Sequence, residues 1–273
     1  MASFPIGKFI KYIILILFAV LFIMPIYVII VTSIKPLDEV SLENMWALPS
    51  AIDFSSYSEA FTKLAPNFLN SIYLVVPATI LSALLGAMNG YVLSKWRFKG
   101  ANTLFLFILF GMFIPYQSIL IPLIQFLRTI DMYNTIPGLI LVHVVYGLPI
   151  TTLMFRNFYA NIPDEMIEAA KIDGANFLGI FRHLIVPLSI TGFVVVAIWQ
   201  FTNIWNEFLF AVTITTSDNQ PIMVALQNLS GSQIVQWNVQ MAGAMIAALP
   251  TMLVYIFLGK YFVRGLLAGS VKG

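Results

Sequence analysis

Six long apolar stretches, nearly free of charged residues, constrain this chain more than any other feature of its sequence. About 20 such residues in a helix cross the hydrocarbon core of a bilayer, where backbone polar groups must be satisfied within the segment itself. The chain is 60% hydrophobic and only 10% charged, so it lacks the polar surface of a water-soluble globule. We predict one all-α transmembrane domain over residues 1–273, with spans at about 10–33, 67–93, 102–127, 137–158, 188–212 and 241–261.

The first stretch could be a signal peptide, but it runs uncharged from Tyr12 to Ile34 and has no small-residue cleavage site, which favours a retained span. Two connections are long, at about 34–66 and 213–240, and the other loops are short. Prolines inside the spans predict kinks, because neighbouring helices in lipid accommodate the break that proline causes. These prolines are Pro25, Pro77, Pro115, Pro122, Pro149 and Pro250.

The distribution of Lys and Arg predicts the orientation, because cytoplasmic loops of membrane proteins carry an excess of both. With both termini inside, eleven of the fourteen basic residues face the cytoplasm, and only Lys35, Lys63 and Arg128 lie outside. We therefore expect a multi-pass protein of the cell (plasma or inner) membrane with its N and C termini in the cytoplasm. The eleven residues are Lys8, Lys11, Lys95, Arg97, Lys99, Arg156, Lys171, Arg182, Lys260, Arg264 and Lys272.

The connection between the fourth and fifth spans, about 159–187, contains the pattern of a short helix. Asn161 can cap it, Pro163 suits its first position, and Asp164 and Glu165 lie where the helix dipole favours acids. Gly174 can adopt the positive φ that ends such a helix. A second amphipathic run, Phe177 to Val186, follows and is closed by Pro187, so we predict a helix-turn-helix at the membrane surface.

The predicted first helix carries small and acidic residues that suit a protein partner. Ala169, Ala170 and Ala175 would let a partner approach closely, and Glu168 and Asp173 offer charge for pairing. The alternative is an amphipathic helix that lies on lipid. Such helices carry basic polar faces, so the acids of this segment favour the protein partner.

This segment also resembles a family signature. Glu168-Ala169-Ala170, three residues, Gly174, nine residues and then Leu184-Ile185-Val186-Pro187 are similar to the cytoplasmic loop of permease subunits in binding-protein-dependent ABC importers. Val186 and Thr191 depart from the usual pattern, outside the docking segment. Further similarity to the carbohydrate branch, and to the six-span second permease of maltose-type importers, lies at Thr32–Lys35, Asn70–Ser71, Trp205–Asn206 and the tail Tyr261–Gly273.

The resemblance implies the type I ABC importer permease fold and a set of partners. Two homologous permeases form the pathway, two cytoplasmic ATPases each bind one coupling loop, and an external sugar-binding protein delivers the cargo. The coupling helix would run from Pro163 to Gly174, with Glu168 paired to a basic residue of the ATPase. The chain has no GxxxxGK[ST] phosphate-binding loop, so we expect ATP and Mg²⁺ to be bound by the partner ATPase, and neither enzymatic activity, cofactor nor nucleic acid in this chain.

The fifth span carries a polar stripe. At 100° per residue, Trp199, Gln200, Asn203, Asn206 and Glu207 fall within an arc of about 120°. Such a stripe faces protein or water rather than lipid, and an intramembrane acid is a candidate functional group. Two interpretations stay open: lining of the transport pathway, and interhelical hydrogen bonding that fixes packing.

Two other polar residues of the spans are weaker candidates. Gln117 in the third span could line the pathway, whereas His143 stands alone among valines and is interpreted as a packing residue.

Three function classes compete: an importer permease, an ion-coupled secondary transporter or channel, and an intramembrane enzyme. Coupled transporters show several intramembrane ionisable residues, and enzymes need a nucleophile or metal constellation, so the permease is favoured. Segments 89–98, 141–147 and 220–226 resemble glucose/mannose-type importers, which favours a monosaccharide as cargo.

Overall fold

The computed structural model describes residues 6–96, 98–231 and 235–270, with side chains for 7–96, 98–231 and 235–261. Every regular element in these ranges is helical, so the predicted all-α class is confirmed. Arg97, Lys272 and the side chains of the C-terminal motif from Phe262 onward lie outside the described residues.

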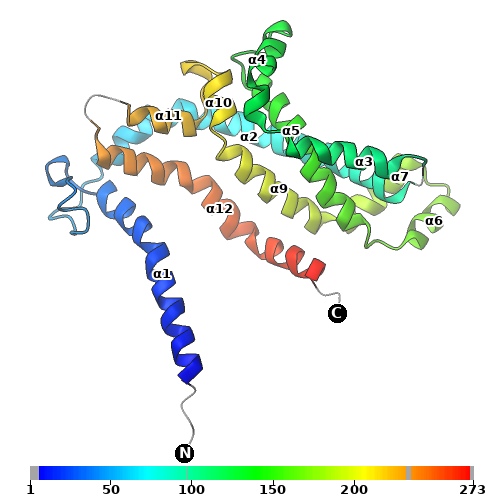
Figure 1. Ribbon diagram of the computed structural model, residues 1–273, viewed down its shortest axis with the longest axis horizontal. Helices are drawn as coiled ribbons and strands as arrows, with labels where there is room; N and C mark the ends of the chain where they lie inside the picture. The colour runs from blue at the N-terminus through cyan, green and yellow to red at the C-terminus, as the bar shows by residue number, and fades with distance from the viewer. Residues whose placement is uncertain (1–5, 97, 232–234, 271–273) are drawn as a thin grey trace, which may run out of the picture. The chain divides into compact units, whose positions relative to one another are not determined.

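Twelve α-helices follow one another along the described chain (Figure 1). Short 3-10 turns lie at Leu37–Glu39, Gly111–Phe113, Tyr116–Ile119 and Ser217–Asn219, and a π-helical turn covers Phe181–Ile185. The α-helices are α1 Ile6–Ser33, α2 Ser55–Lys95, α3 Ala101–Phe110, α4 Leu120–Thr129, α5 Ile136–Tyr159, α6 Asp164–Ile172, α7 Phe177–Ile180, α8 Val186–Leu188, α9 Ile190–Trp205, α10 Leu209–Ile214, α11 Ile222–Leu229 and α12 Trp237–Ser270.

Four of the predicted spans are covered by continuous helices long and apolar enough to cross a membrane: α1, α2, α5 and α12. They run uninterrupted through Pro25, Pro77, Pro149 and Pro250, so proline does not end the helix at any of these positions. The two long connections are also partly helical. Residues 55–66 form the first turns of α2, and α11 lies within 213–240.

The other two predicted spans are broken helices. Ala101–Phe113 and Tyr116–Thr129 are bent by 88°, and Phe177–Leu188 and Ile190–Trp205 by 78°. The first bend lies at Pro115, which lacks an N–H and keeps the preceding Ile114 extended (ψ 116°). The second lies at Ser189. The kink predicted at Pro115 is therefore confirmed, whereas the breaks at Ser189 and at residues 206–208, within the predicted span 188–212, were not predicted.

The chain divides into two compact units, the first made of residues 1–66 and 225–249. Its centre is a small cluster of Ala60, Val239 and Ala242, with Tyr57 and Ile246 packed against it. Its loop after α1 is held by buried Lys35, whose Nζ donates to the Asn44 carbonyl at 2.5 Å. In the same loop, hydrogen bonds from the Ser50 hydroxyl and backbone N–H hold the pKa of Glu39 below its usual range.

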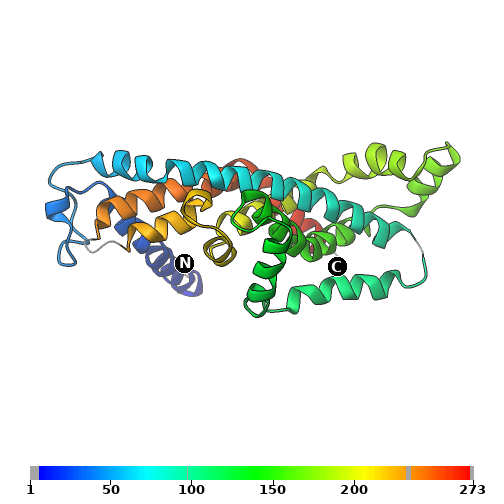
Figure 2. The same ribbon diagram turned by 90° about the horizontal axis from the view of Figure 1, so that it is seen from above.

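The second unit contains residues 67–224 and 250–273, and its helices α2 and α5 approach each other through small residues (Figure 2). A Cβ on Gly86 would lie 2.6 Å from the Cβ of Thr151, and one on Gly90 would lie 2.7 Å from the Cβ of Phe155. Beside this contact lies a buried aromatic cluster that includes Tyr91, Phe155 and Tyr159. Glycines four residues apart on one helix face are a common device for close packing in membranes.

Gly90→Ala is expected to destabilise the chain, because the added methyl group also meets the Arg156 backbone nitrogen at 2.8 Å, and backbone cannot move aside as a flexible side chain can. Overpacking of this kind costs about 1–3 kcal/mol. Thermal unfolding of the detergent-purified chain, followed by tryptophan fluorescence, measures the effect. Gly259→Ala is the matched helical control, because nothing lies within 4 Å of its added Cβ. Equal midpoints for the two variants would contradict the close α2–α5 contact.

Candidate functional site

The predicted surface helix is α6, and its boundaries have clear causes. Asp164 and Glu165 lie in its first turn, next to the free backbone N–H groups. Gly174 has φ +82°, as predicted for the residue that ends the helix, and its N–H donates to the Lys171 carbonyl at 3.0 Å. The N-cap prediction is wrong. Pro163 holds that position, and the Asn161 amide donates backwards to the Asn157 carbonyl at 3.1 Å.

The outward face of α6 carries most of the residues that were singled out for docking. Glu168, Ala169, Asp173 and Gly174 are exposed, and Ala170 is half-buried. Ile167 points the other way and is buried in the aromatic cluster. Sequence reasoning missed Ile172, which is 87% exposed. The missed signal is an apolar side chain at the end of an otherwise polar helix.

The second helical run also forms, with a different ending. Asn176 caps α7 by accepting a hydrogen bond from the Gly179 N–H at 2.7 Å, and a π-helical turn leads into α8. Pro187 lies inside α8 and does not close the segment. The bend comes at Ser189, whose hydroxyl donates to the Ile185 carbonyl at 2.6 Å and so satisfies a carbonyl near the break.

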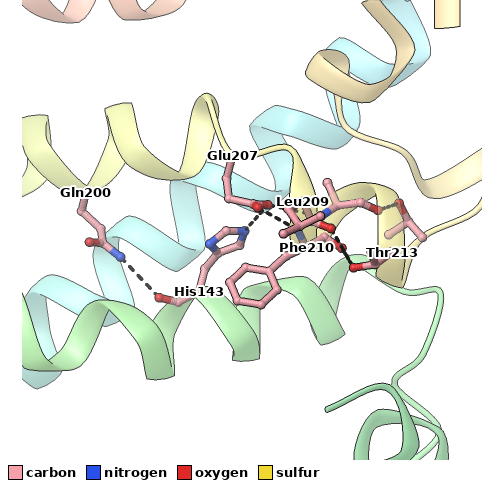
Figure 3. Close-up of polar contacts among 8 residues, drawn as sticks. His143, Gln200, Glu207, Leu209, Phe210 and Thr213 are labelled. Carbon is pink, nitrogen blue, oxygen red and sulfur yellow. Dashed lines mark hydrogen bonds and ion pairs between the residues drawn. The ribbon is translucent and has the colours of Figure 1, made fainter. Parts of the chain in front are cut away.

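The polar stripe predicted on α9 divides between two environments. Gln200 is buried, and its Nε2 donates to Ser82 Oγ at 3.1 Å and to the His143 carbonyl at 3.4 Å (Figure 3). Asn203 and Asn206 are exposed, and their amides donate to carbonyls of their own helix at 2.8 and 2.9 Å. Trp199 is half-buried. Gln200 is therefore enclosed between helices, whereas the two asparagines present an accessible polar surface.

Glu207 lies beyond the end of α9 and caps α10. Its Oε1 accepts from the Phe210 N–H at 2.7 Å and its Oε2 from the Ala211 N–H at 3.2 Å. The His143 Nε2 lies 3.7 Å from Oε2, and the Phe210 ring stands edge-on to the imidazole (Figure 3). His143, which stands alone among valines in the sequence, thus has an acidic neighbour in the structure, because folding brings α5 against the α9–α10 break.

Gln117 lies exposed in the 3-10 turn at the 88° bend, and its neighbour Tyr116 contacts the Phe210 ring at 5.2 Å between centroids.

Within the described residues, no group of three or more His, Asp or Glu side chains is placed to hold a metal ion.

The division of the α9 stripe can be tested by cysteine labelling, since the chain has no cysteine of its own. Asn203→Cys and Asn206→Cys should react with a small water-soluble thiol reagent in the detergent-purified chain, because both side chains are exposed. Gln200→Cys, on the same helix but buried, should stay protected. Equal labelling rates at the three positions would contradict the assignment of separate environments.

Residues 78–268 match the family described as binding-protein-dependent transport system inner membrane component. A probable ABC transporter permease protein of Pyrococcus horikoshii is 47% identical over 97% of this chain and 98% of its own length. A xylose/arabinose import permease of Haloferax volcanii is 33% identical over 94% and 91%. A glucose import system permease of Saccharolobus solfataricus is 30% identical over 96% and 95%.

Among solved structures, a chain of a bacterial ABC transporter for alginate import superimposes with a TM-score of 0.83, at 23% identity, over 96% of this chain and 98% of that one. This likeness shows the type I ABC permease fold. A chain of a bacterial alginate transporter in complex with its oligosaccharide-bound periplasmic protein gives a TM-score of 0.64, at 12% identity, over 92% and 93%. Permease components of this family are not enzymes, and ATP hydrolysis lies in separate subunits. The chain therefore belongs to the binding-protein-dependent transport system inner membrane components and is a multi-pass permease subunit of an ABC transporter in the cell membrane.

Proposed function

We propose that this chain forms half of the translocation pathway of an ATP-driven sugar importer, with α6 as its coupling helix. In this proposal the chain crosses the membrane six times with both termini in the cytoplasm, each bent helix pair serving as one span. The observation that carries the proposal is the exposed acidic and small-residue face of α6, bounded by Pro163 and Gly174.

The position of α6 supports a docking role. In both views α6 and α7 lie at one end of the second unit, whereas α4 and α10 lie at the other (Figures 1 and 2). Glu168 and Asp173 are exposed and offer carboxylates. The Ile172 side chain is also exposed and offers apolar surface that a partner could bury. A cleft that accepts one apolar side chain and pairs basic residues with these acids would fit this surface. We assign that cleft to the ATPase, which also binds ATP and Mg²⁺.

The remaining partners follow from the same assignment. A second homologous permease would complete the pathway, and an external sugar-binding protein would deliver the cargo, as the alginate transporter complex illustrates for that system. Asn203 and Asn206 supply amides to the pathway, because amide groups donate and accept hydrogen bonds as sugar hydroxyls require.

The substrate class rests on the relatives. Their names include xylose/arabinose, glucose, diacetylchitobiose and alpha-glucoside import, so sugars are a shared theme, and xylose, arabinose and glucose are monosaccharides. We propose a monosaccharide of the glucose/mannose type. Calorimetry of the cognate binding protein against a panel of mono- and oligosaccharides tests this point separately from the role of α6, and selective binding of an oligosaccharide would overturn it.

Glu168→Lys is expected to weaken docking, because it places a cation where the partner cleft offers basic residues. ATPase co-purification and sugar uptake should each fall at least tenfold, which corresponds to about 1.4 kcal/mol. The measurements are the ATPase content of the affinity-purified complex and uptake into proteoliposomes.

Glu59→Lys is the matched control for this prediction. It makes the same charge change at an exposed position on α2, where Glu59 pairs with Lys63 at 2.6 Å. Its complex should keep a wild-type ATPase content. Wild-type docking and uptake in Glu168→Lys would show that α6 is not the coupling helix.

A further inference from the structure

The last residues of α2 hold the first turn of α6. The Lys95 Nζ lies 2.7 Å from Asp164 Oδ1 and donates to the Ile162 carbonyl at 2.5 Å. The Lys95 side chain is only 5% exposed, whereas that of Asp164 is 52% exposed. A buried ammonium group is costly without acceptors, so this lysine is tied to the start of α6.

Trp96, the residue that follows α2, contacts the other end of α6. The Lys171 Nζ, in the last turn of α6, lies 4.7 Å from the centroid of the Trp96 ring. Trp96 also packs against Phe177 of α7, with ring centroids 5.2 Å apart. The last residue of α2 and the residue that follows it therefore contact α6 at both of its ends.

A side chain of α6 itself fills the space between these two contacts. Ile167 is buried in the cluster that contains Tyr91 and Phe155. Tyr91 of α2 packs on Phe177 at 5.0 Å and on Phe181 at 5.5 Å. The whole loop after α5 is thus packed on the last turns of α2, and a displacement of α6 must displace those turns or break these contacts.

A small hollow lies between the contacts of Lys95 and Trp96 with α6 and the exposed residue Glu168. It has a volume of about 290 Å³ and is lined by Lys95, Trp96, Asp164, Ile167, Glu168 and Lys171. The contact that fixes α6 to α2 therefore lies beside the surface assigned to the partner.

We infer that Lys95 and Trp96 are positioning residues that couple α6 to α2, so that a movement of α6 imposed by its ATPase partner is passed along α2. This inference rests on the proposed docking role of α6. The transmitting element is one uninterrupted helix, and its close contact with α5 at Gly86 and Gly90 carries the movement to a second helix.

The test uses the assembled transporter, with its binding protein and ATPase, in proteoliposomes. Lys95→Met removes the charge and keeps most of the side chain volume. It should leave the ATPase bound and hydrolysing ATP, but lower the sugar taken up per ATP hydrolysed at least fivefold. A second variant, Lys171→Met, removes the cation from the Trp96 ring and should also lower the sugar taken up per ATP hydrolysed.

Three further variants separate coupling from folding. Asp164→Asn combined with Lys95→Met should be no worse than Lys95→Met alone, because residues that act as a pair are non-additive. Lys95→Arg keeps the charge and should retain at least half of the wild-type ratio. Lys63→Met, which breaks the exposed Lys63–Glu59 pair, is the matched control and should leave the ratio unchanged.

The outcomes distinguish this inference from the docking proposal. An unchanged uptake per ATP in Lys95→Met, with the ATPase bound, overturns the coupling role of Lys95. A lowered thermal midpoint together with loss of the ATPase would show a merely structural role and also overturns it. Failure of the docking proposal has a different signature, namely Glu168→Lys complexes that keep their ATPase.

Discussion

The close contact between α2 and α5 organises the second unit. Gly86 and Gly90 let the two backbones approach, and side chains on both sides of the contact are then fixed in register. Toward one end, Phe155 and Tyr91 form the cluster that receives Ile167 of α6. Toward the other, His143 of α5 meets Glu207 and Gln200. A single packing contact thus positions α6 and the buried polar groups at the α9–α10 break.

Polar side chains bond the backbone at two interruptions of helices in this chain. Backbone groups released at a break must find partners, because lipid offers none. At one break the Ser189 hydroxyl donates to the Ile185 carbonyl, and at the next the Glu207 carboxylate accepts from two backbone N–H groups. The sequence points to Glu207 as an intramembrane acid. In the structure its carboxylate caps α10, which is a structural role. Asn203 and Asn206 remain the better candidates for contact with a watery pathway.

Local signals in the sequence predicted the surface helix well. These signals are read from neighbours along the chain: acids at residues 164 and 165, a glycine at 174, and small residues beside the acids at 168 and 173. The structure has the helix at Asp164–Ile172, with Gly174 at positive φ and Glu168 exposed. The N-cap was misassigned, because a proline at residue 163 occupies the position and leaves Asn161 to bond backwards. The bend at Ser189 carried no local signal, since the proline nearby lies within a helix.

Hydropathy and composition alone determined that this protein is a helical membrane protein, because burial in lipid imposes a continuous apolar run and internal backbone bonding on every span. Residue types at short spacing determined the helix Asp164–Ile172 and its end at Gly174. Only the tertiary structure decided which polar residues meet. A helical wheel places Gln200 and Asn203 on one stripe, yet packing against α2 and α5 buries the first and leaves the second exposed. The Lys95–Asp164 and His143–Glu207 pairs join distant parts of the chain, and such pairs depend on how helices pack rather than on local sequence.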